Sequence, residues 1–416
     1  MHKTILNKII FMFIMIFIAW ISFIPESLQI RYVGSVQSIL VAMVILSLYL
    51  HKFNLSKYFI LQNALFWVYI FLFSINIWFA KDLDLSRGYY RGFILIAIPI
   101  YFILQHQLDK NKTRRILYFL CICAGLVALF GFMEMIFKHN FLYENIVSNV
   151  FYERFILINK RMMSTLMHPN VLSSYLLACL PIAYYFYVSE KRGSIKNVNF
   201  ATFLLIFSAI GLTFSRGTWI SLILMLTVWM ALKRKFKWIV LVWSLAVLFI
   251  WFSSSRFCFI PGFRHRFRIE LLRHYIKYAH RTGAYLVTWS MLKEHPFVGI
   301  GLGHFRVLFN LYSNTKRSYE VMIPDSVYLM HLAETGIIGF AGFIAFLGSI
   351  FRKLFISYGK SEENSKKLIF YMSISFIGLL FNMNTYDVFL WKTPLYLFWL
   401  FCGILMSFSM EEQARL

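Results

Sequence analysis

The sequence is poor in charged residues, and this shortage excludes most soluble proteins. Charged side chains make up 14% of the 416 residues, whereas an ordinary soluble domain carries roughly a quarter. Hydrophobic residues make up 60%. The composition therefore indicates a polytopic membrane protein, and the length suits one bundle of spans better than several soluble domains.

Cysteines are also scarce, and their spacing matches neither a metal site nor a disulfide framework. Four of the five lie in apolar segments, where we interpret them as small packing residues. The five are Cys121, Cys123, Cys179, Cys258 and Cys402. The N-terminal apolar run lacks a small-residue cleavage site after Ile24, so we expect a retained first span rather than a signal peptide.

Acidic residues are less than half as numerous as basic ones. The chain has 18 Asp and Glu against 42 Lys and Arg, which gives a formal net charge of +24. A charge of this size is compatible with nucleic-acid binding. In a membrane protein, however, an excess of Lys and Arg in cytoplasmic loops accounts for much of it, and the placement of the spans tests that explanation.

Twelve segments are apolar enough to cross the hydrocarbon core, which takes about 20 residues for a helix. They are residues 8–24, 34–50, 58–80, 88–106, 114–137, 169–188, 199–214, 217–232, 237–254, 325–351, 367–384 and 389–410. The seventh and eighth are the weakest predictions, because both are short and only Ser215 and Arg216 separate them. We expect an all-α polytopic membrane protein in which residues 1–416 form a single transmembrane bundle.

Lys and Arg cluster in every second loop, and this pattern sets the orientation. With a cytoplasmic N-terminus the basic loops lie inside, and twelve spans place both termini inside. Two long loops, 138–168 and 255–324, then lie outside, where long segments translocate regardless of charge. The first has apolar residues spaced for one face of an interfacial helix. The second contains a basic helical segment near 264–280, a helix near 283–293 and a glycine-rich turn.

Two arginines on the predicted outer side are the first candidate site residues. Arg216 lies in Thr213-Phe-Ser-Arg-Gly217 between two apolar runs, where an ionisable residue is costly and points to function. An arginine that extends to lipid headgroups is the alternative. Arg281 follows a run of basic residues. Two guanidinium groups from separate segments are suited to clamp a diphosphate, while the basic residues before Arg281 are expected to contact anionic headgroups.

Three alternate glycines, Gly299, Gly301 and Gly303, follow His295-Pro296. Their spacing differs from the G-x-G-x-x-G of dinucleotide sites, so nucleotide binding is not predicted here. We expect them instead to permit a tight backbone path beside a ligand or a helix end.

The beginning of the tenth span carries the candidate base. Asp325 is positioned to take a proton from a sugar hydroxyl at the mouth of a cavity, although a helix N-cap role is the alternative. His331 and Glu334 are three residues apart and share a helix face; they are secondary site candidates, with a buried hydrogen-bonded structural unit as the alternative. His168 is a further candidate, and lipid contact explains neither Glu134 nor Arg161.

Four motifs together resemble the O-antigen ligase and polymerase superfamily of bacterial membrane glycosyltransferases, over roughly residues 155–340. They are Arg161-x3-Thr165-x2-His-Pro-Asn170, Thr213-Phe-Ser-Arg-Gly217, Arg281 set fifteen residues before Pro296, and Asp325-Ser-x-Tyr-Leu-x3-Ala-Glu-Thr-Gly336. Each motif is loose alone. Their order and spacing, beside a large external loop, make the resemblance fairly specific.

The resemblance implies an all-helical fold of the GT-C kind, with about twelve spans and a large periplasmic loop between spans nine and ten. Such enzymes move a glycan from undecaprenyl diphosphate to an acceptor without metal or nucleotide sugar. It implies that Arg216 and Arg281, with Arg161, hold the donor diphosphate. The family's usual histidine base aligns with Asp325, so Asp325 is the expected base, and His168 or His304 could replace it.

The resemblance leaves two enzymatic functions open. One is a ligase in the bacterial inner membrane that transfers polysaccharide to a lipid A core on the periplasmic side, with inversion of the anomeric centre. The other is an O-antigen or capsule polymerase that uses the same donor and a lipid-linked acceptor. A transporter of polyprenyl lipid or glycan is the third hypothesis. It is disfavoured because no inverted repeat is evident in the sequence and the notable charges lie on the outer side.

Overall fold

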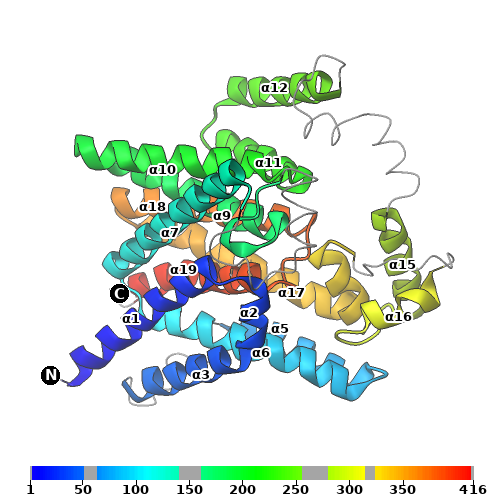
Figure 1. Ribbon diagram of the computed structural model, residues 1–416. Coiled ribbons are helices and arrows are strands. Elements are labelled where there is room, and N and C mark those ends of the chain that lie inside the picture. The colour runs from blue at the N-terminus through cyan, green and yellow to red at the C-terminus, as the bar shows by residue number, and fades with distance from the viewer. Residues whose placement is uncertain (1, 51–62, 140–160, 255–279, 314–323, 414–416) are drawn as a thin grey trace.

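The computed structural model describes residues 2–50, 63–139, 161–254, 280–313 and 324–413. Within those ranges the chain is helical and contains no strand. The predicted all-α fold is therefore confirmed. The long helices form one bundle, and the beginning of α1 and the end of α19 lie at the same end of it (Figure 1).

The first part of the bundle covers residues 2–137. Its elements are α1 (His2–Phe23), α2 (Glu26–Arg31), α3 (Val33–Leu50), α5 (Ala64–Ile75), the 3-10 helix η1 (Asn76–Phe79), α6 (Leu83–Gln107) and α7 (Lys110–Phe137). Asp82 and Asp109 cap α6 and α7, because their side chains accept the orphan backbone N–H groups of the first turn.

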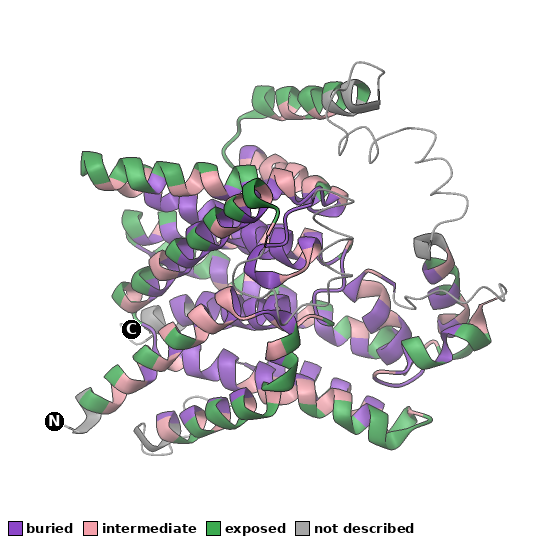
Figure 2. Ribbon diagram, in the orientation of Figure 1, coloured by how far each residue is buried: buried purple, intermediate pink, exposed green. Residues whose placement is uncertain are grey.

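The second part covers residues 161–254. Its elements are the 3-10 helix η3 (Ser164–Leu166), α9 (Pro169–Ser189), α10 (Gly193–Leu212), α11 (Arg216–Leu232) and α12 (Phe236–Ser254). The least secure pair of predicted spans thus corresponds to two separate helices, α10 and α11, broken at residues 213–215. Helix α12 lies at the edge of the bundle and is mostly exposed (Figure 2).

The third part contains α15 (His280–Glu294), α16 (Phe305–Tyr312), α17 (Val327–Lys360), α18 (Glu363–Asn382) and α19 (Lys392–Gln413). The helix predicted near 283–293 is confirmed as α15. Helix α17 is kinked at Gly336, which has a φ of 63°. A Cβ there would collide with the backbone of Phe297, so this position requires glycine.

Within the described ranges, six helices are long and apolar enough to cross a membrane: α1, α6, α7, α9, α10 and α17. Shorter apolar helices lie in α3, α5 with η1, α11, α12 and α19. Each of the twelve predicted segments overlaps a described helix, and the count of twelve spans stays a prediction. The predicted interfacial helix of 138–168 and the basic segment 264–280 lie largely or wholly outside the described residues.

The core of the bundle is formed by α9 and α19, which are buried along most of their length (Figure 2). Both helices are apolar on all sides, as a helix surrounded by others requires. At the predicted outer end, connecting segments bond to one another. The backbone N–H of Met162 donates to Leu212 O at 3.0 Å, and that of Val327 donates to Met383 O at 2.9 Å. The first bond joins the first motif to the residue before the second, and the other joins the fourth motif to the segment after α18.

Candidate active site

The segment 161–168 is held in place by Glu134, near the end of α7. The Glu134 side chain is fully buried. Its Oε2 accepts the backbone N–H groups of Met163 at 3.2 Å and Ser164 at 2.7 Å. Ser164 has a φ of 54°, an uncommon conformation that these bonds help to fix. The structure thus gives Glu134 a structural role, in which its carboxylate fixes the backbone of the first motif.

Arg161 connects the first motif to the second. Its buried guanidinium donates from Nε to Thr213 O at 2.8 Å and from Nη2 to Asn170 Oδ1 at 2.9 Å. The first bond fixes the break between α10 and α11, three residues before Arg216. Arg161 is therefore a structural link, and its predicted contact with a donor diphosphate stays untested.

Arg216 is the first residue of α11 and is half-buried. The next residue, Gly217, packs so closely on Thr385 that a Cβ at this position would collide with the threonine side chain. The N-terminal end of α11 therefore lies against the α18–α19 connection, residues 383–391. A helix N-terminus carries partial positive charge, which adds to that of the arginine and favours an anion.

A buried hydrogen-bond network fixes this junction. The Oγ of Ser173 and Oγ1 of Thr218 lie 2.7 Å apart, and Asn382 Nδ2 donates to Thr218 Oγ1 at 3.0 Å. The Ser174 hydroxyl donates to Asn382 Oδ1 at 2.5 Å. These bonds tie together α9, α11 and α18. A fully paired polar network of this kind rigidifies the elements around it.

The α18–α19 connection contains Asp387, a residue that the sequence analysis did not single out. Its side chain is buried, with 1% exposed. Oδ1 accepts the N–H of Phe389 at 3.2 Å, whereas Oδ2 has no hydrogen-bond partner among the described residues. Burial raises the pKa of Asp387 to about 7, and the negative charge of Asp325 adds to the rise. Buried carboxylate oxygens are normally paired, so this one marks a functional candidate.

The α18–α19 connection also carries the aromatic residues Tyr386 and Trp391. His168 stacks on Trp391 with ring centroids 4.6 Å apart, and on Tyr386 at 6.1 Å. The Tyr386 hydroxyl and the Trp391 Nε1 are buried and, within the described part of the chain, lack hydrogen-bond partners. His168 also caps α9, since its Nδ1 accepts the N–H of Asn170 at 3.3 Å. The α18–α19 connection thus carries three buried polar atoms without hydrogen-bond partners among the described residues, those of Tyr386, Asp387 and Trp391. Such an arrangement is suited to a polar ligand.

Asp325 precedes α17 and is half-buried, with a φ of 47°. The N-cap of α17 is Ser326, whose Oγ accepts the N–H of Leu329 at 3.4 Å. The capping role that was the alternative for Asp325 therefore belongs to Ser326. Because Asp325 influences the pKa of Asp387, its carboxylate lies near that connection. Arg216, Asp325 and Asp387 thus border the same part of the predicted outer face.

The three alternate glycines have φ values of +70° at Gly299, +94° at Gly301 and +75° at Gly303. A Cβ on Gly299 would lie 2.5 Å from the backbone of Glu334, and one on Gly301 would lie 2.6 Å from Cα of Ala80. The backbone at these glycines therefore runs in close contact with its neighbours. Residues 299–303 pack between α17 and the α5–α6 connection.

Two other predicted candidates, His304 and Glu334, have structural partners. His304 Nε2 accepts the N–H of Asp82 at 2.9 Å, so its Nδ1 carries the proton donated to Leu302 O at 2.9 Å. Glu334 Oε1 accepts the N–H of Phe305 at 3.2 Å. Both ring nitrogens of His304 are thereby engaged, which disfavours this histidine as the base.

His331 is buried and bonds through Nε2 to the Tyr69 hydroxyl at 2.9 Å. It therefore contacts a different partner from Glu334, although the two share a helix. Arg281 is the second residue of α15, and its side chain lies outside the described atoms. The predicted pairing of Arg281 with Arg216 stays a prediction.

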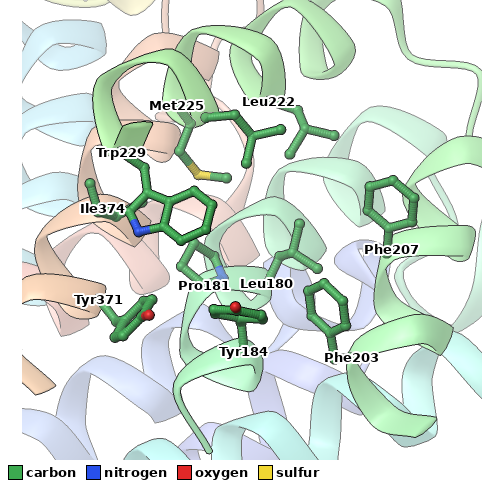
Figure 3. A pocket seen from close by; sticks show the side chains of 11 residues that line it. Leu180, Pro181, Tyr184, Phe203, Phe207, Leu222, Met225, Trp229, Tyr371 and Ile374 are labelled. Atoms are coloured by element: carbon green, nitrogen blue, oxygen red, sulfur yellow. The ribbon is translucent and has the colours of Figure 1, made fainter. Parts of the chain in front are cut away.

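An apolar cleft of about 110 Å³ lies between α9, α10, α11 and α18 (Figure 3). Its wall on α11 begins at Leu222, six residues after Arg216. The lining residues are Leu180, Pro181, Tyr184, Phe203, Phe207, Leu222, Met225, Leu226, Trp229, Tyr371 and Ile374. Aliphatic and aromatic side chains of this kind suit a hydrocarbon ligand.

Comparison with known proteins supports the resemblance found in the motifs. No curated protein matches the chain. Residues 201–344 match the family model described as O-Antigen ligase. The match covers Arg216, Arg281, the glycine turn and Asp325, which are four of the features identified from the sequence. Residues 201–344 of the chain are therefore similar to the O-antigen ligase family.

Proposed function

We propose that this protein transfers a glycan from undecaprenyl diphosphate to an acceptor hydroxyl, on the periplasmic side of the bacterial inner membrane. The ligase reaction, with a lipid A core as acceptor, is the form that we favour. The observation that carries the proposal is the meeting of Arg216, Asp325 and Asp387 around the α18–α19 connection. An anion-binding group and a carboxylate base are the functional groups that such a transfer needs.

Arg216 binds the diphosphate of the donor, assisted by the N-terminal end of α11. Arginine pairs with phosphate oxygens through parallel N–H groups, and its charge stabilises the negative charge that develops on the leaving diphosphate. Arg281 supplies a second guanidinium from the large loop. Because a diphosphate is already a good leaving group, the reaction needs no separate general acid.

Asp325 acts as the general base. The acceptor oxygen attacks the anomeric carbon while its proton passes to the Asp325 carboxylate, and the bond from the anomeric carbon to the diphosphate oxygen breaks. A single displacement of this kind inverts the anomeric centre. The proton then leaves Asp325 to water. The negative charge of Asp325 adds to the raised pKa of the buried Asp387.

The apolar cleft in Figure 3 is proposed to hold part of the polyprenyl tail. Its wall on α11 begins six residues after Arg216, which corresponds to about 9 Å along a helix. A donor whose diphosphate contacts Arg216 therefore has an apolar path beside α11. Met225→Trp should fill the cleft and slow transfer from a long-chain donor, while transfer from a farnesyl-chain donor should change little. Equal loss with both donors would contradict this placement of the tail.

A deletion strain tests the function and separates ligase from polymerase. Without a ligase, the lipid A core loses all long chains and carrier-linked polymer accumulates. Without a polymerase, the core carries a single repeat unit. The wild-type gene should restore normal chains, and the Arg216→Ala gene should not, at equal protein levels in the membrane. Restoration by Arg216→Ala would contradict the proposed donor site.

A further inference from the structure

A second cavity lies on the predicted outer side, away from the α18–α19 connection. It has a volume of about 370 Å³ and is formed between the α5–α6 connection and helices α15 and α16. In Figure 1 these helices lie at the right of the bundle. The lining residues are Phe79, Lys81, Glu294, His295, Ile300, Leu308, Leu311 and Tyr312.

The polar wall combines donors and acceptors. The Tyr312 hydroxyl donates to Glu294 Oε2 at 2.7 Å. Burial, together with that carboxylate, raises the pKa of Tyr312 to about 12, so the hydroxyl stays protonated. Lys81 adds an ammonium and His295 an imidazole. Sugar hydroxyls both donate and accept, and a wall of this composition offers them both kinds of partner.

The rest of the lining is apolar, and the elements that supply it also carry strongly exposed apolar side chains. Leu308 and Leu311 come from α16, and Phe79 from η1. Trp78 is 74% exposed and Leu311 is 71% exposed. Exposed Trp beside exposed aliphatic residues is typical of the membrane–water interface, where the ring lies at headgroup level. A ligand in this cavity would therefore be a headgroup attached to the membrane.

The cavity is fixed to the helix that carries the candidate base. The Ser86 hydroxyl donates to Leu302 O at 2.6 Å, and the N–H of Ile300 donates to Ala333 O at 3.0 Å. Ala333 lies six residues into α17, or about 9 Å along the helix from its first residue, Val327. Ile300 thus connects the wall of the cavity to the segment that begins just after Asp325.

We propose that this cavity is a sugar-binding subsite that holds a residue of the membrane-anchored acceptor glycan. The inference rests on the proposed transfer function, because the acceptor must reach Asp325 from the outer leaflet. The carboxylate, ammonium and hydroxyl groups bind sugar hydroxyls, and the apolar wall packs on the carbon face of the ring. The subsite selects and positions the acceptor and takes no part in donor binding.

Binding of an acceptor fragment tests the subsite without requiring catalysis. The full-length protein is reconstituted in lipid nanodiscs, and delipidated lipopolysaccharide core oligosaccharide is titrated by saturation-transfer NMR. Lys81→Ala and Glu294→Gln should each weaken binding about tenfold, the loss expected for one charged hydrogen bond. Leu311→Trp, which fills the cavity, should abolish it. Lys293→Ala removes a neighbouring cation that lies over Trp289, outside the cavity lining, and should have no effect.

Two further arms make the result decisive. Arg216→Ala should bind the oligosaccharide as the wild type does, so a failed donor site and a failed acceptor subsite give different results. Inorganic phosphate at equal concentration should not displace the oligosaccharide, and displacement would assign the cavity to a phosphate headgroup instead. Unchanged affinity in Lys81→Ala, Glu294→Gln and Leu311→Trp, or no binding to the wild type, would overturn the proposal.

Discussion

The Arg161 guanidinium donates to the carbonyl oxygen of Thr213 over 2.8 Å, which ties the first motif to the break that precedes Arg216. Arg161→Ala should therefore lower both thermal stability and transfer rate. Loss of a charged hydrogen bond at a buried site costs about 2 kcal/mol. Arg161→Lys cannot reproduce the two bonds and should be intermediate. Melting temperature and transfer rate measured on the same preparations check this. If Arg161→Ala lost transfer at an unchanged melting temperature, direct substrate binding would replace the structural role.

Asp325 and Ser326 are adjacent but have different predicted roles. Asp325→Asn should abolish transfer and leave the melting temperature nearly unchanged, because the base is lost and the cap remains. Ser326→Ala should keep transfer and destabilise the protein by about 1 kcal/mol, as for loss of an N-cap. Transfer assays and thermal unfolding in detergent distinguish the two. Wild-type transfer by Asp325→Asn would remove this residue from the mechanism.

The buried carboxylate of Asp387 predicts a dependence of stability on pH. Its pKa in the folded protein is raised to about 7. Between about pH 4 and pH 7 the folded state holds a proton that the unfolded state has released, so stability falls as pH rises through this window. The melting temperature should decline from pH 5 to pH 8 in the wild type. Asp387→Asn should show a smaller decline, and an identical decline would contradict the assignment.

Alanine should have different effects at two glycines, Gly299 in the glycine turn and Gly283 in α15. Gly299→Ala places a Cβ 2.5 Å from the Glu334 backbone at a φ of +70°, so it should destabilise the protein by more than about 1 kcal/mol. Gly283→Ala lies in α15 with no atom within 4 Å of the added Cβ. It should be neutral or stabilising, since alanine favours helices. Thermal unfolding of the two variants checks the comparison, and equal melting temperatures would contradict it.

Long apolar runs and the breaks between them were enough to locate the long helices, but not short ones such as α2 and α16. The break at Ser215 appears in the sequence as polar residues between two apolar runs, and it separates α10 from α11. The glycine turn was predictable for a similar reason, because alternate glycines indicate a backbone path that a Cβ would block. Such local signals need no knowledge of the tertiary structure.

The roles of Asp387, Arg161 and Glu134 depend on tertiary contacts. Asp387 becomes a functional candidate because folding buries it close to Asp325. Nothing in its local sequence indicates that burial. Arg161 was expected to bind a ligand, whereas the structure gives it two protein partners. Sequence reasoning identified Arg161 and Glu134 as unusual charges but could not name their partners, which come from segments far apart in the chain.

The most direct measurement of the central claim is transfer of a glycan from purified undecaprenyl-diphosphate-linked donor to purified acceptor by the reconstituted protein. The wild type should form product with no other protein present. Arg216→Ala should lower kcat/KM at least about a hundredfold, the effect of removing one preorganised electrostatic contact. Arg87→Ala removes a surface arginine of the same predicted face, which pairs with Asp84 at 3.5 Å, and should match the wild type. No product from the wild type, or equal kcat/KM in Arg216→Ala, would contradict the account.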